Sequence, residues 1–187
     1  MSQPSPTYSR VAVALHWIIA LLVFGQIGLV MAHDATEGDL SRNLIGLHKA
    51  GGMLILALTL VRIAWRFKEP WIALPAEMKS WEKWLARATQ IGFYVVLLAL
   101  PLGGWAASSA AGRDISFYGL FNWPLLPIDG GREVARQIMG MHELGAKFLY
   151  VLLLLHIAGA LKHHFVDKDN VLRRMLPFLA ERPGRPD

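Results

Sequence analysis

Apolar residues in this 187-residue chain occur in four long blocks and not in short periodic stripes. A helix needs about 20 consecutive apolar residues to cross the hydrocarbon core of a bilayer. The blocks at 11–32, 44–65, 90–108 and 138–162 meet this requirement closely enough to be interpreted as membrane spans. The pattern predicts an all-α fold, an integral membrane four-helix bundle in which residues 1–187 form a single membrane domain.

Basic residues are distributed unequally among the segments that connect these blocks. Arg10, the loop 66–87 and the segment from Lys162 onwards together carry 12 Lys and Arg, whereas the two opposite loops carry 4. Lys and Arg are enriched on the cytoplasmic side of membrane proteins. We therefore expect a multi-pass protein of the bacterial inner membrane with cytoplasmic N and C termini. The cytoplasmic tail 163–187 should begin with a short interfacial helix.

The composition excludes several kinds of site. The chain has no cysteine, so thiolate zinc sites, iron-sulfur clusters, disulfides and covalent haem attachment are ruled out. The net charge of +5 could suggest nucleic acid, but the basic residues lie beside apolar blocks. Membrane lipid is the expected partner, and nucleic acid is not. The stretch Val30-Met31-Ala32 could pass for a signal-peptidase site, but its apolar run exceeds the usual length of about 7 to 15 residues.

Four of the seven histidines lie inside or at the mouth of the predicted spans: His16, His48, His142 and His156. Ionisable side chains at this depth are costly and usually functional. A single such histidine is as readily an interhelical hydrogen-bonding residue, but four at matching depths favour a ligand set. His142 and His156 are 14 residues apart, so they share one face of a helix at a separation of roughly 21 Å.

Depth in the membrane predicts how these histidines pair. His16 and His156 both lie near the cytoplasmic face and should form an inner pair, whereas His48 and His142 should form an outer pair. A six-coordinate b-type haem takes two axial side chains. The sequence therefore predicts two non-covalent haem b groups, each with bis-histidine iron ligation.

Other residues are assigned around these pairs. Arg62 follows His48 by 14 residues, which places it at the depth of the inner haem as a propionate ligand. Arg10 could do the same or serve as a topology anchor. His163 follows His156 by seven residues and could bind a quinone carbonyl or lie among the headgroups. Gly51, Gly145 and Gly159 each follow a histidine by three residues. They could make room for a porphyrin or allow close contact between helices, and the two explanations are equally good.

Several local motifs resemble the bacterial cytochrome b561 family, which comprises short four-helix di-haem proteins of the inner membrane. These motifs are R-x5-HW at 10–17, GLHKAGG at 46–52, PLGGW at 101–105 and the ending KHHFVDKDNVLRRMLP at 162–177. The resemblance covers about 8–179 and implies that His16, His48, His142 and His156 ligate two haems. It also implies a superoxide oxidase that oxidises superoxide at the periplasmic side and reduces ubiquinone.

Superoxide is an anion, and the outer loops are not basic overall. Its attraction would have to be local, from Arg42, Lys49, Arg132 and Arg136 near the mouth of the outer haem. Alternatively, the protein has the same haems but no substrate of its own. It would then bind a protein partner and act as a membrane anchor or electron relay for a separate dehydrogenase. A histidine-lined metal or proton transporter would need the histidines but no porphyrin.

Overall fold

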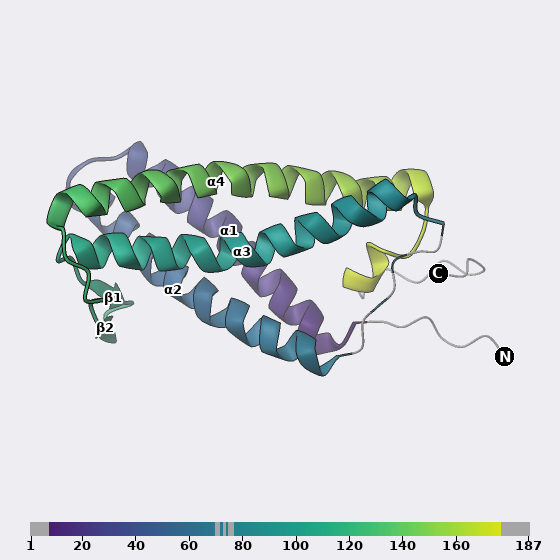
Figure 1. Cartoon of the computed structure of the whole chain (residues 1–187), viewed down its shortest axis with the longest axis horizontal. Coiled ribbons are helices and arrows are strands. Elements are labelled where there is room, and N and C mark those ends of the chain that lie inside the picture. Colours follow the sequence, from purple (N-terminus) through teal and green to yellow (C-terminus); the bar gives the residue numbers. More distant parts are fainter. Residues whose placement is uncertain (1–7, 70–71, 73, 75–76, 177–187) are drawn as a thin grey trace.

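The computed structural model describes residues 8–69, 72, 74 and 77–176, and four long helices dominate it (Figure 1). They are α1 (Arg10–Asp34), α2 (Gly38–Lys68), α3 (Ser80–Ala110) and α4 (Gly131–Lys162). Each is long and apolar enough to cross a membrane. These helices confirm the predicted all-α membrane bundle. The four ranges expected for the spans lie within them.

The helices pack as two pairs that differ in how closely they approach each other. α1 runs along α2, α3 runs along α4, and α2 joins the pairs by packing against α3. Within the described residues, α4 approaches α1 and α2 less closely. In Figure 1, α1 and α2 cross diagonally behind α3 and α4. The apolar core at the centre receives residues from all four helices: Ile19, Val23, Ile55, Val96, Leu149 and Leu152.

A β-hairpin closes one end of the bundle, which we call the hairpin end. Strand β1 (Ile115–Phe117) pairs antiparallel with β2 (Phe121–Trp123). Ile115 is buried and packs against Met53 and Leu56 of α2. The Trp105 indole donates a 2.9 Å hydrogen bond to the carbonyl of Pro124, which ties the loop to α3. The segment between the third and fourth spans is therefore attached firmly to the helices beneath it.

The opposite end, where α1 begins and α4 finishes, is called the terminal end. Beyond α4 the chain forms a π-helical turn, η1 (His163–Asp167), and a 3-10 turn, η2 (Arg173–Met175). The Trp17 indole of α1 donates a 2.7 Å hydrogen bond to the carbonyl of Met175. The expected interfacial helix is thus replaced by two short turns that fold back onto α1. Residues 177–187 of the expected tail lie outside the described part of the chain.

The close approach of α3 and α4 depends on Gly92. A Cβ atom at this position would lie 3.0 Å from Cδ2 of Leu152, a buried core residue. Replacing Gly92 with Val should therefore destabilise the bundle by about 1 to 3 kcal/mol through overpacking. Thermal unfolding of the purified protein in detergent should show a Tm lowered by several degrees.

Gly140→Val is the matched control, because a Cβ at Gly140 of α4 would meet nothing within 4 Å. Both substitutions change the intrinsic helix propensity by the same amount, so the difference between the two Tm values reports packing alone. Equal Tm values for both variants would contradict this account of α3 and α4.

Candidate functional site

Two histidine pairs bridge α4 to the α1–α2 pair. The rings of His16 and His156 have centroids 6.0 Å apart, and those of His48 and His142 are 6.3 Å apart. The ring planes are inclined by 63° in the first pair and 76° in the second. The structure therefore brings together the two combinations that the sequence predicted. Each pair joins helices that otherwise approach each other loosely.

The spacing of the rings can be compared with that required by metal ligation. Two imidazoles that bind one metal ion from opposite sides, at nitrogen–metal distances of about 2 Å, have centroids roughly 6 Å apart. Both pairs have this spacing. Neutral imidazole is also the axial ligand that haem iron commonly takes from proteins. The donor set thus fits two b-type haems, one held by each pair.

Backbone and glycine contacts fix the orientation of His142. Its Nδ1 lies 2.9 Å from the carbonyl oxygen of Leu100 in α3. A carbonyl only accepts, so Nδ1 carries the proton and Nε2 keeps its lone pair for a metal. Cβ atoms added at Gly103 and Gly104 would lie 4.0 and 3.6 Å from this ring. A Cβ at either glycine would thus only contact the ring at ordinary van der Waals distance, and the carbonyl of Leu100 sets the tautomer of the imidazole.

Sequence reasoning missed this role of α3. The run Pro101-Leu102-Gly103-Gly104 was recognised as a motif, but no function was given to it. The signal was present, because two adjacent glycines inside an apolar helix commonly mark a close approach by another group. Only the position of α4 reveals that the approaching group is the His142 ring.

The three glycines that follow the histidines differ in their surroundings. A Cβ at Gly51 would meet the Gln26 amide, and one at Gly145 would lie 2.9 Å from Cδ2 of Leu100. A Cβ at Gly159 would meet nothing within 4 Å. Gly51 and Gly145 therefore serve close packing between helices, whereas Gly159 leaves open space one turn from His156.

Arg62 lies at the His16–His156 pair, as its spacing predicted. Its guanidinium donates a 2.9 Å hydrogen bond to the carbonyl of Ala12 in α1. Its charge acts on both imidazoles of the pair. Arg62 also lines a small cavity at the terminal end together with Tyr8, Ala12, Trp65, Arg66, Glu69, Gln90, Tyr94 and Met175. A cation in this position can neutralise a buried carboxylate. Arg10, in contrast, is exposed at the first residue of α1.

His163 is held by acidic residues that follow it. Its Nδ1 lies 2.6 Å from Oδ2 of Asp169 and 3.2 Å from Oδ2 of Asp167. The ammonium of Lys162 bridges Asp167, at 2.7 Å, to Glu82 of α3, at 3.1 Å. The ligand atoms of His163, Asp167 and Asp169 lie within 4.8 Å of one another, a spacing that a metal site could have. Here Lys162 already supplies a positive charge to Asp167.

Within the described part of the chain, the basic residues at the hairpin end differ in whether they form ion pairs. Arg42 forms an ion pair with Asp39, and Arg136 forms one with Glu133 at 2.9 Å. Lys49, next to His48 in α2, is close enough to Arg113 for the two positive charges to interact. The basic residues that the sequence gathered at this mouth are therefore not equivalent. Lys49 and Arg113 concentrate positive charge there.

Comparison with known proteins places these features in a family. The family described as prokaryotic cytochrome b561 matches residues 7–178. The chain is 33% identical over 174 residues to "Cytochrome b561 homolog 2" of Escherichia coli K12, covering 90% of each protein. It is 30% identical to "Cytochrome b561 homolog 1" of the same organism, covering 91% of this chain and 97% of that protein. It is 27% identical to "Probable superoxide oxidase CybB" of Yersinia pestis, covering 91% and 96%. A match over nearly the whole chain shows that this membrane protein belongs to the prokaryotic cytochrome b561 family of haem-containing electron-transfer proteins.

Proposed function

We propose that the chain is a di-haem b-type cytochrome that transfers electrons across the bacterial inner membrane, oxidising superoxide at the periplasmic side and reducing ubiquinone. The observation that carries this proposal is the two facing imidazole pairs, with centroids 6.0 and 6.3 Å apart, at two levels of α4 that are 14 residues apart. The excess of Lys and Arg at the terminal end supports a cytoplasmic position for that end. The hairpin end would then face the periplasm.

The ligands can be assigned residue by residue. His16 and His156 would hold one haem, and His48 and His142 the other. A haem held by two imidazoles supplies a reversible one-electron centre. Arg62, which lies against the first pair, is the residue that we assign to a propionate there. Arg10 is exposed at the start of α1, a position that suits a topology anchor better than a propionate ligand.

Superoxide would be attracted at the hairpin end by Lys49 and Arg113. Each superoxide anion gives up one electron and becomes dioxygen. Arg42 and Arg136 already have acidic partners, so their fields are largely cancelled at a distance. Lys49 adjoins His48 in sequence, so it is the cation best placed to guide an anion towards that pair.

Ubiquinone would be reduced at the terminal end, near His163. A quinone takes up two electrons and two protons when it becomes quinol, so its site needs a proton donor. Asp169 accepts a hydrogen bond from Nδ1 of His163. This contact leaves Nε2 free to donate to a quinone carbonyl when the ring is protonated. Lys162 forms ion pairs with Asp167 and Glu82, and these pairs anchor the segment that carries His163 and Asp169.

Loss of one ligand should remove one haem. We expect His156→Ala to lower the haem content from about two to about one per chain, because the remaining His48–His142 pair is untouched. His142→Ala should have the same stoichiometric effect through the other pair. Pyridine haemochrome quantitation of the purified variants measures the content directly.

His33→Ala is the control for this measurement, because His33 belongs to neither imidazole pair and is hydrogen-bonded to Ser41 where α1 meets α2. It should retain about two haems. Unchanged haem content in both ligand variants would remove the assignment of the imidazole pairs.

Mixing with superoxide tests the reaction itself. Stopped-flow mixing of the oxidised protein with superoxide should reduce its b-type absorption bands, and added ubiquinone should reoxidise them. Isolated protein is sufficient for this cycle if superoxide is the donor. If superoxide does not reduce the protein although its haem content is full, the chain would instead be an electron relay for a separate dehydrogenase.

Lys49 should govern the encounter with superoxide. Lys49→Gln is expected to lower the second-order rate constant several-fold at low ionic strength, and the difference should shrink as salt screens the charge. Arg136→Gln is the matched control, because Arg136 is already paired with Glu133. Equal losses in both variants, or a loss independent of salt, would show that Lys49 does not steer the anion.

A further inference from the structure

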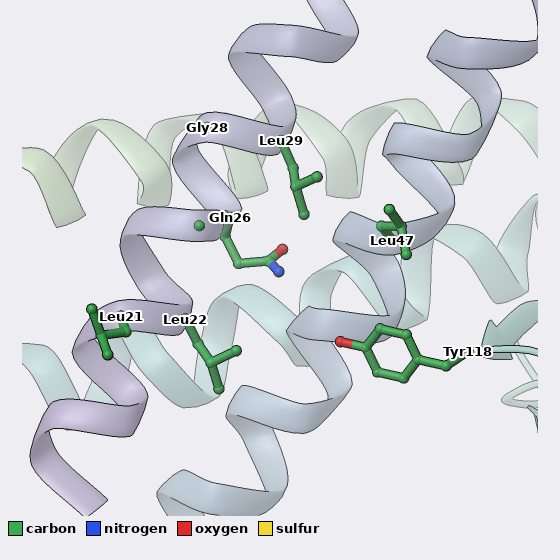
Figure 2. A pocket seen from close by; sticks show the side chains of 8 residues that line it. Leu21, Leu22, Gln26, Gly28, Leu29, Leu47 and Tyr118 are labelled. Carbon is green, nitrogen blue, oxygen red and sulfur yellow. The ribbon is translucent and has the colours of Figure 1, made fainter.

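A groove between α1 and α2 is lined by none of the residues assigned above to haem, superoxide or quinone. It has a volume of about 420 Å³. Leu21 and Leu47 on its rim are 70% and 44% exposed, so the groove opens towards the bilayer. Figure 2 shows it between the two helices, near the hairpin. Its lining is mostly leucine and glycine, with two polar residues: Leu21, Leu22, Gly25, Gln26, Gly28, Leu29, Leu47 and Tyr118.

The two polar side chains converge on one point of the groove. Figure 2 shows the Gln26 amide directed from α1 towards α2, and the Tyr118 hydroxyl reaching in from the hairpin. A Cβ at Gly51 of α2 would meet the Gln26 amide and would lie 3.5 Å from the Tyr118 hydroxyl. Oε1 of Gln26 is buried and has no hydrogen-bond partner among the residues that the structure describes. A buried acceptor of this kind is destabilising unless a donor reaches it.

The backbone at Tyr118 holds this arrangement at some cost. Tyr118 has φ of 52°, in the left-handed region that bulky residues rarely adopt. The conformation directs the ring away from the strands and over α2 (Figure 2). Ile115, buried against α2, anchors the hairpin from which Tyr118 projects.

These features select the chemistry of a ligand. A lipid acyl chain would fill the leucine surface but would leave the Gln26 oxygen without a donor. A flat ring on an apolar tail fits the leucine surface, and in its quinol form a ring hydroxyl can donate to the Gln26 oxygen. The Gln26 amide can donate to a carbonyl or accept from a hydroxyl, and Tyr118 can do the same. We infer that this groove binds the headgroup of an isoprenoid quinone, in its quinone or quinol form.

The location distinguishes this site from the quinone site at His163. Gly51 is one helical turn from His48, so the groove adjoins the His48–His142 pair, at the other end of the bundle from His163. The ligand class rests on the proposed function, which makes quinone the membrane-soluble substrate. The groove is thus a second quinone site, reached laterally from the outer half of the bilayer.

Photolabelling of the haem-loaded protein tests the site. An azido-ubiquinone with a decyl tail would be the probe, with excess decylubiquinone as competitor and peptide mapping as the readout. We expect competed labels in α1 around 21–29 or at the hairpin, besides labels near His163. Gln26→Leu and Tyr118→Phe should each lower the groove label about tenfold, as expected for one lost hydrogen bond. Gly28→Leu should abolish it, because a Cβ at Gly28 meets nothing within 4 Å and its side chain would fill the groove.

Matched substitutions on the exposed surface of α4 control for general effects. Gln137→Leu and Tyr150→Phe should leave every label unchanged, and all variants are compared at equal haem content. Labels confined to the His163 region would overturn the groove site and leave the proposed function standing. A groove label that excess quinone does not displace, or that persists in all three groove variants, would assign the groove to lipid chains. A complete absence of competed label would overturn both quinone sites.

Discussion

The structure depends on four imidazoles that are held inside an apolar bundle and joined in pairs across it. Helices in lipid gain nothing from hydrophobic exclusion, because the surrounding chains are as apolar as their own side chains. The shared core at the centre is small, and α4 approaches α1 and α2 only loosely. The His16–His156 and His48–His142 pairs cross those loose contacts. A group bound between each pair would therefore join the two halves of the bundle, so cofactor binding and fold stability are coupled.

The two ends of the bundle are built for different chemistry. At the hairpin end, Lys49 and Arg113 place two positive charges together, while Arg42 and Arg136 are each paired with an acidic neighbour. At the terminal end, Arg62 is half-buried and lies close to two imidazoles, and Asp169 holds the ring of His163. One end suits the attraction of a small anion, and the other suits the storage of a proton. This polarity agrees with electrons entering at the hairpin end and leaving at the terminal end.

The sequence predicts the depth of a side chain in the membrane much better than it predicts which residues surround that side chain. Helical rise alone placed Arg62 at the level of the first pair and gave the combinations in which the histidines meet. Rotation about the helix axis and the angles between helices are tertiary properties, so the contact of His142 with Leu100 could not be derived. The partners of His163 were hidden for a related reason. Asp169 reaches the ring only because Lys168 adopts a left-handed conformation that turns the chain back.

The hairpin is the element that periodicity least anticipated, and it has two structural roles. Ile115 packs into α2 beside Met53, which closes the bundle over the His48–His142 end. Tyr118, the first residue after the anchored strand, lies in the turn and extends over the outer side of the same helix. Closure alone would require only the buried contact, and a glycine would suit the left-handed position of Tyr118 at lower cost. Because strained positions persist where the surrounding structure holds them and cluster at functional sites, the tyrosine is better explained by its hydroxyl over Gly51 than by the fold of the loop.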